Sequence, residues 1–367
     1  MLKTNKYRIY PNKEQEILIN KTFGCVRFVF NKMLKFRKDL YSQTLLSYSK
    51  IECNNWCNRV LKEDYPWLRE VDKFALTNTI YNMDNAYQKF FKEHAGFPKF
   101  KSKKDNYASY TTNYTNNNIK VDYNNNQIKL PKLGIVKCKV HRELNGKIKN
   151  ATISRTPSGK YYVSITYECN KEVLPITNKV IGIDLGIKDL VITSDGVKYE
   201  NPHTLDKNKK RLIRLQRRLS KKVKGSNNYN KLRKKVALCH EKITNIRNDN
   251  LHKISHKLIC ENQVIVTEDL KVKNMVKNHN LARSLSDASF GELIRQLEYK
   301  SNWHSRTLIK IDTYYPSSQL CHVCGNKYPK VKNLLIRNWV CPNCHSNNDR
   351  DINAAINILK EGLRILS

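Results

Sequence analysis

The sequence predicts a multidomain α+β chain of 367 residues, a length that suits two or three domains. Three kinds of pattern follow one another along it. Apolar residues recur at helical spacing up to about residue 93, and short alternating polar and apolar runs fill about 105–170. From about residue 178, buried strands alternate with helices. We therefore expect a helical domain, a small antiparallel barrel and a mixed α/β domain.

The helical pattern is inserted within the pattern of short strands. Tyr7-Arg-Ile-Tyr10 alternates like a strand that stops at Pro11, and Asn12 with Gln15 has the spacing of a capping box. A long amphipathic helix follows to about residue 42, with further helices near 48–63 and 72–93. Short strands are expected at 107–112, 119–121, 127–130, 134–140, 151–155 and 160–168. We assign residues 1–11 and 105–175 to the barrel, which makes 12–104 a helical insertion.

The third pattern begins with a buried strand at 180–184 that ends in Asp184, and residues 190–193 form its hairpin partner. Residues 207–235 contain fourteen Lys or Arg and predict a basic helical hairpin. A second buried strand at 264–268 ends in Glu268. A helix near 287–306, a strand at 308–311 and a helix at 352–364 complete this region.

Four cysteines near the C-terminus have the spacing of a zinc ribbon. Cys321 and Cys324 form one CxxC turn, and Cys341 and Cys344 form a second. Four thiolates leave no open position on Zn²⁺, so the ion is expected to be structural. The seven other cysteines are scattered, a pattern typical of reduced thiols in a cytosol.

Three carboxylates end or begin elements in the order expected for an RNase H-like fold, namely Asp184, Glu268 and Asp351. In that fold a mixed sheet brings acids from separate segments to one edge. Phosphodiester hydrolysis by two Mg²⁺ ions needs several such hard oxygen ligands. Each acid alone also has an ordinary interpretation: a turn acid, a strand-end acid and a helix N-cap.

The charge indicates a polyanionic partner. The chain has 68 Lys and Arg against 32 Asp and Glu, a net charge of +36, and such a protein repels itself unless phosphates neutralise it. A membrane surface is the alternative, but the basic residues are spread from end to end. No apolar stretch is long enough to span a membrane, and the N-terminus lacks a signal-peptide core.

Several motifs together resemble the TnpB family of transposon-encoded RNA-guided nucleases, which are related to type V CRISPR effectors. They span nearly the whole chain: Tyr7-Arg-Ile-Tyr-Pro11, Phe23-Gly24…Arg27…Asn31, Gly96-Phe-Pro-Lys-Phe-Lys101, Gly182-Ile-Asp184-Leu-Gly-Ile-Lys-Asp-Leu190, Glu268-Asp-Leu270, the cysteine ribbon and Asp349-Arg-Asp351-Ile-Asn-Ala-Ala355.

The resemblance implies a wedge (WED) barrel split by a helical recognition domain. It also implies a RuvC nuclease domain at 176–316 and 346–367, interrupted by a zinc-ribbon domain at 317–345 that binds target nucleic acid. The catalytic and Mg²⁺-binding triad carries over as Asp184, Glu268 and Asp351. Asp351 is preferred to Asp349 because the family's acid stands two residues before the Asn of the Asn-Ala-Ala run. Because side chains alternate along a strand, only one of Glu268 and Asp269 can face the metals, and we choose Glu268.

The implied partners are a guide RNA and double-stranded target DNA, with one protein chain per RNA, no membrane and a prokaryotic cytoplasmic location. A transcriptional regulator of the same fold and a DNA-strand-joining transposase are the alternatives. Arg337 is expected either to guide a scissile phosphate or to be a solvated ribbon charge. The expected nucleic-acid contacts, each of which is also an ordinary surface or turn residue, are Thr77, Asn78, Tyr81, Asn82, Lys101, Tyr110, Thr111 and Thr112. The barrel lysines expected to face the RNA are Lys120, Lys129, Lys132, Lys137, Lys139, Lys147 and Lys149.

Overall fold

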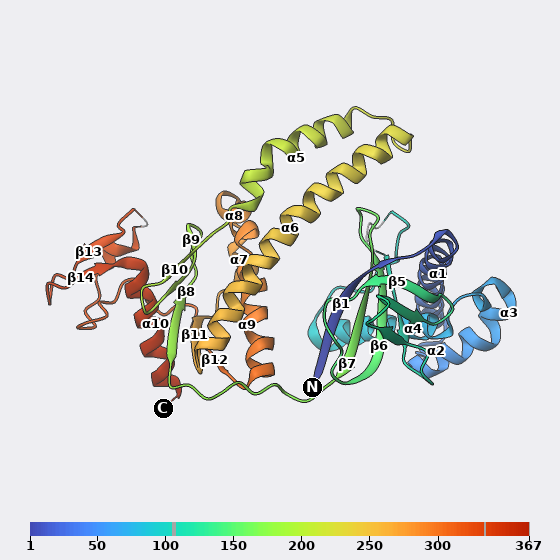
Figure 1. Cartoon of the computed structure of the whole chain (residues 1–367), viewed down its shortest axis with the longest axis horizontal. Helices are drawn as coiled ribbons and strands as arrows, with labels where there is room; N and C mark the ends of the chain where they lie inside the picture. Colours follow the sequence, from blue (N-terminus) through green and yellow to red (C-terminus); the bar gives the residue numbers. More distant parts are fainter. Residues whose placement is uncertain (105–107, 334, 367) are drawn as a thin grey trace. The chain divides into compact units, whose positions relative to one another are not determined.

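The structure, a computed structural model, describes residues 1–104, 108–333 and 335–366. The chain forms two compact units, Met1–Asn170 and Lys171–Ser367 (Figure 1). Each unit has its own apolar core.

The first unit contains a seven-stranded antiparallel sheet in the order β2-β6-β7-β1-β5-β4-β3. Its strands are β1 (Leu2–Tyr10), β2 (Ala108–Asn113), β3 (Lys120–Asp122), β4 (Gln127–Leu130), β5 (Gly134–Lys139), β6 (Lys147–Arg155) and β7 (Tyr161–Glu168). β1 pairs with both β7 and β5, so residues before the helical insertion do belong to this sheet. The expected strand at 107–112 is observed as β2, except that Tyr107 lies outside the described residues.

The expectation of a closed barrel is wrong. β2 pairs only with β6 and β3 only with β4, so within the described chain both are edge strands and the sheet stays open. Closure needs hydrogen bonds between the two edges. Here β3 has three residues, and β2 instead packs against two helices, α1 and α4.

The helices of this unit are α1 (Lys13–Thr44), α2 (Lys50–Trp56), α3 (Lys62–Asp64) and α4 (Lys73–Glu93), with a π turn at Cys57–Leu61 and a 3₁₀ turn at Pro66–Arg69. The predicted capping box is present: Asn12 Oδ1 accepts from the Gln15 amide at 2.8 Å, and Gln15 Oε1 accepts from the Asn12 amide at 3.0 Å. The predicted helix at 48–63 is observed as a continuous helical stretch over 50–64, in which the π turn joins α2 to α3. α1 and α4 pack side by side.

The second unit contains a five-stranded mixed sheet in the order β10-β9-β8-β11-β12. Its elements are β8 (Val180–Asp184), β9 (Asp189–Thr193), β10 (Lys198–Glu200), α5 (Thr204–Ser220), α6 (Asn227–Glu261), β11 (Val264–Glu268), α7 (Val272–Met275), α8 (His279–Ala288), α9 (Phe290–His304), β12 (Thr307–Ile311), a 3₁₀ turn (Pro329–Lys332), β13 (Asn338–Val340), β14 (Asn347–Asp349) and α10 (Arg350–Leu366). β8, β11 and β12 run parallel, and β9 is antiparallel to β8.

Helix α10 covers one face of this sheet, and two glycines allow the close approach. A Cβ on Gly182 of β8 would lie 2.2 Å from the Ala355 carbonyl oxygen, and one on Gly362 of α10 would lie 2.2 Å from the Val266 side chain. Any larger residue would push the helix off the sheet. The opposite face packs against α6, α8 and α9 through a core that includes Leu258 and Leu297.

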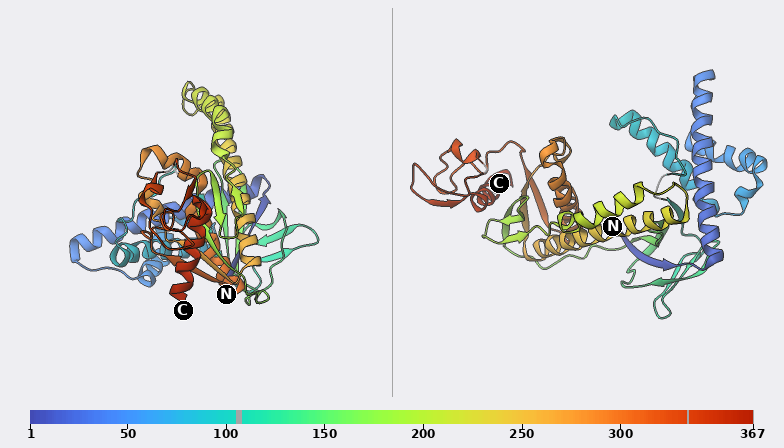
Figure 2. Two further views of the ribbon diagram at one scale, coloured as in Figure 1. Left: turned by 90° about the vertical axis from the view of Figure 1, so that its left-hand side faces the viewer. Right: turned by 90° about the horizontal axis from the view of Figure 1, so that it is seen from above.

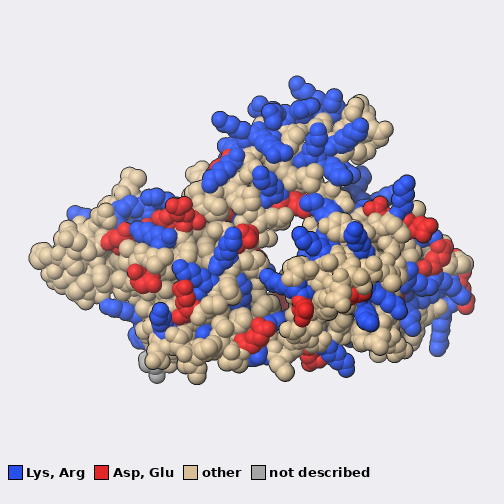
Figure 3. All heavy atoms as spheres, viewed as in Figure 1, with Lys and Arg blue, Asp and Glu red and all other residues tan. Residues whose placement is uncertain are grey.

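Helices α5 and α6 form the predicted basic hairpin, but α6 extends far beyond residue 235 (Figure 2). Ser226 caps α6 by accepting from the Tyr229 amide at 3.2 Å. The buried side of α5 contributes Leu212 and Leu215 to a small core shared with α6, and lysines and arginines crowd its outer side (Figure 3). Within the described ranges no helix is long and apolar enough to cross a membrane.

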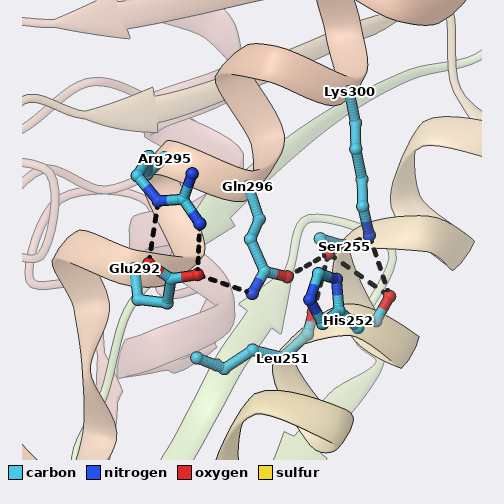
Figure 4. Close-up of polar contacts among 7 residues, drawn as sticks. All are labelled: Leu251, His252, Ser255, Glu292, Arg295, Gln296 and Lys300. Carbon is cyan, nitrogen blue, oxygen red and sulfur yellow. Dashed lines mark hydrogen bonds and ion pairs between the residues drawn. The ribbon is translucent and has the colours of Figure 1, made fainter. Parts of the chain in front are cut away.

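A polar network joins α6 to α9 inside the second unit (Figure 4). Lys300, which is buried, donates to the Ser255 hydroxyl at 2.7 Å and to the His252 carbonyl at 3.0 Å. Ser255 also hydrogen-bonds to the fully buried Gln296 Oε1 at 2.9 Å, and Gln296 donates to Glu292 at 3.0 Å. Buried polar groups are costly unless partnered, so this network fixes how the two helices pack behind the sheet.

Candidate functional site

Two acids meet at one edge of the mixed sheet because they end adjacent parallel strands. Ile183 of β8 is in register with Thr267 of β11, so Asp184 and Glu268 are the next residues on each strand. Parallel strands lie about 4.8 Å apart. Two acids that sequence analysis placed at strand ends are therefore neighbours across the sheet.

The third acid, Asp351, lies on α10, which packs on the same face of the sheet. Side chains alternate along a strand, so Asp184 shares the side of Gly182, which touches α10, and Glu268 shares the side of Val266, which packs on α10. Asp351 lies in the first turn of that helix. Three segments that are distant in sequence thus direct carboxylates toward one edge.

The charges of the other two acids affect Asp184. The pKa of Asp184 is raised to about 7, first by burial and then by the negative charges of Glu268 and Asp351. The pKa of Glu268 is also raised, by burial, although the Ser317 hydroxyl opposes this by donating to Glu268 Oε1 at 2.6 Å. Such a cluster is costly without a cation to neutralise it. Hard carboxylate oxygens are the donors that Mg²⁺ prefers, so the donor set fits that ion.

Asp184→Asn is expected to stabilise the metal-free protein at neutral pH. The ordinary pKa of an unfolded aspartate is about 3.9, below the folded value of about 7, so the folded state holds this proton more tightly. The carboxyl therefore costs no stability below about pH 4, and the cost grows between pH 4 and 7 to at most about 4 kcal/mol. Thermal unfolding of both proteins at pH 4.5 and pH 7.5 would measure this.

The gain from Asp184→Asn should be large at the higher pH and small at the lower one. Added Mg²⁺ should raise the melting temperature of the unsubstituted protein and have little effect on Asp184→Asn, because the substitution removes a ligand charge. A stability difference that does not change with pH would contradict the assignment of a raised pKa to this carboxyl.

Two acids adjacent to these carboxylates, Asp349 and Asp269, make structural contacts instead. Asp349 caps α10: its Oδ1 accepts from the amides of Asp351 at 3.0 Å and Ile352 at 3.1 Å, and its Oδ2 pairs with Lys198 at 2.7 Å. Asp269 forms an ion pair with Lys271. Both pKa values are lowered; for Asp269 the main cause is the Lys271 hydrogen bond, and for Asp349 the Lys198 and backbone hydrogen bonds outweigh burial.

Arg337 lies against Asp351. Its Nη1 is 3.2 Å from Asp351 Oδ2 and 3.4 Å from Oδ1, and about half of its side chain stays exposed. Among the described residues, the only group of three or more acids, cysteines or histidines close enough to hold an ion is the cysteine cluster. The three carboxylates are thus within electrostatic reach of one another but are more widely spaced than the four sulfurs, and the Arg337 guanidinium lies beside Asp351.

Two asparagines of α10 hold this edge together through hydrogen bonds that were not predicted from the sequence. Asn353 and Asn357, one turn apart on α10, both donate to the Leu320 carbonyl at 2.7 Å, and Asn357 donates to the Ser317 carbonyl at 2.8 Å. Asn353 Oδ1 accepts from the His322 amide at 2.8 Å. The Asn-x-x-x-Asn spacing was the available signal, since it places two amides on one helix face.

The four predicted cysteines converge. Their sulfurs all lie within 4.8 Å of one another, and Cys321–Cys344 and Cys324–Cys341 are each 3.6 Å apart. Tetrahedral zinc with bonds of about 2.3 Å separates sulfurs by roughly 3.8 Å. Burial opposes ionisation of Cys321, but hydrogen bonds from Ser346 and the backbone lower its pKa to about 6. The geometry and the acidic thiol both fit a Cys₄ zinc ion.

Of the residues expected to contact nucleic acid, some are buried, some are bonded to other residues and some are exposed. Tyr110 and Thr112 are buried, because alternate side chains of β2 face the core beneath α1 and α4, so in this conformation neither presents a base-reading group. Asn78 donates to the Thr111 carbonyl at 2.9 Å and to Asn113 Oδ1 at 3.0 Å, which ties α4 to β2. Asn82 is exposed.

Three further candidates take part in local contacts. Thr77 donates to Asn54 Oδ1 at 3.0 Å, Tyr81 has the Lys50 ammonium 5.4 Å from its ring centre, and Lys101 has its ammonium 4.2 Å from the ring centre of Phe30. The expected RNA-facing lysines are all exposed, since Val136 and Cys138 take the buried positions between the lysines of β5. One of them, Lys149, pairs with Glu168 at 2.6 Å.

Three family models match parts of this chain. Residues 164–279 match a family described as "Probable transposase", residues 290–358 one described as "Cas12f1-like, TNB domain", and residues 1–45 one described as "Helix-turn-helix domain". In the structure the last segment is one strand and one long helix.

Relatives align along nearly the whole chain. A Streptomyces pristinaespiralis protein named "Putative RNA-guided DNA endonuclease" is 39% identical over 98% of this chain and 89% of its own length. An Escherichia coli protein named "Putative RNA-guided DNA endonuclease InsQ" is 33% identical over 100% of this chain and 94% of its own. A TnpB-like protein of Acanthamoeba polyphaga mimivirus is 24% identical over 99% of this chain and 74% of its own.

Proposed function

This chain belongs to the TnpB family, and from that membership we propose that it is an RNA-guided DNA endonuclease. It cleaves target DNA by metal-dependent hydrolysis of a phosphodiester bond beside a short flanking motif. One observation of this structure carries the proposal: carboxylates from β8, β11 and α10 share one face at one sheet edge, where burial, and then the charges of Glu268 and Asp351, raise the pKa of Asp184.

In this proposal Asp184, Glu268 and Asp351 hold Mg²⁺. Two bound ions would supply an activated water and neutralise the leaving oxygen. Ser317 orients Glu268 through its hydrogen bond, and Asn353 and Asn357 hold the 317–322 segment against α10. Arg337 is within reach of Asp351, which suits a cation that releases the carboxylate and meets a phosphate when substrate arrives.

We assign the domains and their roles from the same family resemblance. We assign residues 1–11 and 105–175 to an open WED sheet and 12–104 to the recognition helices. Residues 176–316 and 346–367 form the RuvC nuclease, and 317–345 form the zinc ribbon. The basic surfaces bind the backbones of guide RNA and DNA, while base pairing supplies sequence selection. We propose that one chain acts with each RNA, in the prokaryotic cytoplasm.

The decisive experiment compares cleavage of one DNA by protein alone, by protein with the RNA that co-purifies with it, and by protein with a re-targeted guide. Cutting is expected only where the guide matches the DNA. Equal cutting in all three would make the protein a guide-independent nuclease. Guide-dependent binding without cutting would support a regulator, and joined strands would support a transposase.

Asn82→Ala is expected to change the preferred sequence beside the cleaved target, because Asn82 is an exposed amide on α4 able to bond to base edges. Sequencing a cleaved library with randomised flanks would show the change. Asn55→Ala, which removes an exposed amide from the adjacent α2, is the matched control and should leave the preference intact. If the unsubstituted protein, Asn82→Ala and Asn55→Ala all prefer the same flanking sequence, Asn82 does not belong to the recognition surface.

A further inference from the structure

A glycine in the middle of α1 has no packing reason to be there. Gly24 is the single glycine of this 32-residue helix, and a Cβ built on it would meet no atom within 4 Å. Gly182 and Gly362 differ, because neighbouring atoms exclude a side chain at both. Glycine is a poor residue for a helix interior. Its presence at an open position leaves bare helix backbone accessible from outside.

Gly24 lines a cavity of about 350 Å³. Helix α1 also contributes Arg27, Phe28, Lys32 and Lys35 to it, and Phe100 enters from the segment that follows α4. The lining therefore combines two aromatic rings, three cations and a strip of exposed backbone.

The far wall of this cavity is held in place. Asn31 of α1 donates from Nδ2 to the Lys101 carbonyl at 2.9 Å, and its Oδ1 accepts from the Lys101 amide at 2.8 Å. These two bonds fix the segment that carries Phe100, whose side chain is still 57% exposed. Phe28 is braced by edge contacts with Tyr65 and Trp67, at 4.8 and 4.9 Å between ring centres.

The cations around the cavity are not neutralised by acids. In the described part of the chain, Arg27, Lys32 and Lys35 have no carboxylate within ion-pair distance. Lys32 instead lies 5.2 Å from the ring centre of Tyr65. Clustered cations without acids favour phosphates, and an exposed ring beside them favours a base, since bases stack on aromatic side chains irrespective of sequence.

We propose that this cavity binds an unstacked nucleotide of single-stranded DNA. The base stacks on Phe100 above the backbone at Gly24, and the flanking phosphates contact Arg27, Lys32 and Lys35. The choice of DNA rests on the proposed function, in which guide pairing displaces a DNA strand.

The test uses the full chain with fluorescent oligothymidylate and oligouridylate, without guide RNA or divalent metal. Salt of about 0.3 M suppresses binding by charge alone. Phe100→Ala and Gly24→Gln are each expected to weaken oligothymidylate binding about tenfold, because one removes a stacking ring and the other fills the cavity. The melting temperature of Gly24→Gln should equal or exceed that of the unsubstituted protein, since glutamine favours a helix more than glycine does.

Matched controls are Gly291→Gln on α9, another helix position with open space around its Cβ, and Phe91→Ala, an exposed ring that does not line the cavity. Both should retain affinity. Photo-crosslinking with an iodouracil-substituted DNA strand should label residues within 24–35 or 96–101. Unchanged affinity in the two cavity variants, crosslinks only elsewhere, or a loss for oligouridylate as large as that for oligothymidylate would overturn the proposal. Because no guide or cleavage is involved, these outcomes are independent of the nuclease assignment.

Discussion

Asp351→Asn is expected to abolish RNA-guided DNA cleavage, with a loss of at least about a thousandfold, the scale on which single electrostatic groups at active sites act. The substitution keeps the shape of the side chain but removes a charge that would hold Mg²⁺ at the sheet edge. Binding of guide RNA and DNA should persist, because phosphate contacts elsewhere on a chain of charge +36 hold the complex. Single-turnover cleavage and filter binding measure the two effects separately.

Asp349→Asn is the matched control two residues away. Asparagine caps a helix about as well as aspartate, so it can still accept from the amides of Asp351 and Ile352, while the ion pair with Lys198 is lost. Cleavage should fall only modestly. Normal cutting by Asp351→Asn together with loss of cutting in Asp349→Asn would reverse the assignment of the catalytic acid.

Removal of one ligand from the proposed zinc site is expected to unfold the ribbon and abolish DNA cleavage. The ribbon's core consists of Cys321, Val331, Trp339 and Cys341, with a few partly buried neighbours, which is too small to be stable without a metal. Cys341→Ser should reduce bound zinc from one ion per chain to nearly none, measured by elemental analysis. Cleavage should fall with it, because the segment 317–322 that leads into the ribbon is bonded to α10 and to Glu268.

Cys260→Ser provides the comparison, since Cys260 is an exposed cysteine of α6 outside the cluster. The zinc content and the cleavage activity of the Cys260→Ser protein should match those of the unsubstituted protein. Purified protein that contains no zinc, or Cys341→Ser protein that keeps both zinc and activity, would exclude a Cys₄ site.

The candidate site was largely predictable because its signals are local. A run of apolar residues that ends in an acid identifies both Asp184 and Glu268, and two CxxC turns identify the zinc ligands. The capping box at Asn12 and the helix and strand periods likewise depend on residues a few positions apart. The choice of Asp351 over Asp349 came from the family resemblance, and the cap formed by Asp349 supplies a physical reason for it.

What the sequence left undecided depends on contacts between distant segments. Whether β2 meets β3 is a matter of pairing across the whole sheet, and the packing of α1 and α4 on β2 leaves the sheet open and buries Tyr110 and Thr112. The cavity at Gly24 exists because Asn31 bonds to Lys101, seventy residues away. Sequence alone identified the strand-end acids Asp184 and Glu268, the four thiolates and the elements that carry them, because spacing and periodicity over a few residues encode each. Only the tertiary structure decided which faces are covered, because burial depends on partners that no local pattern specifies.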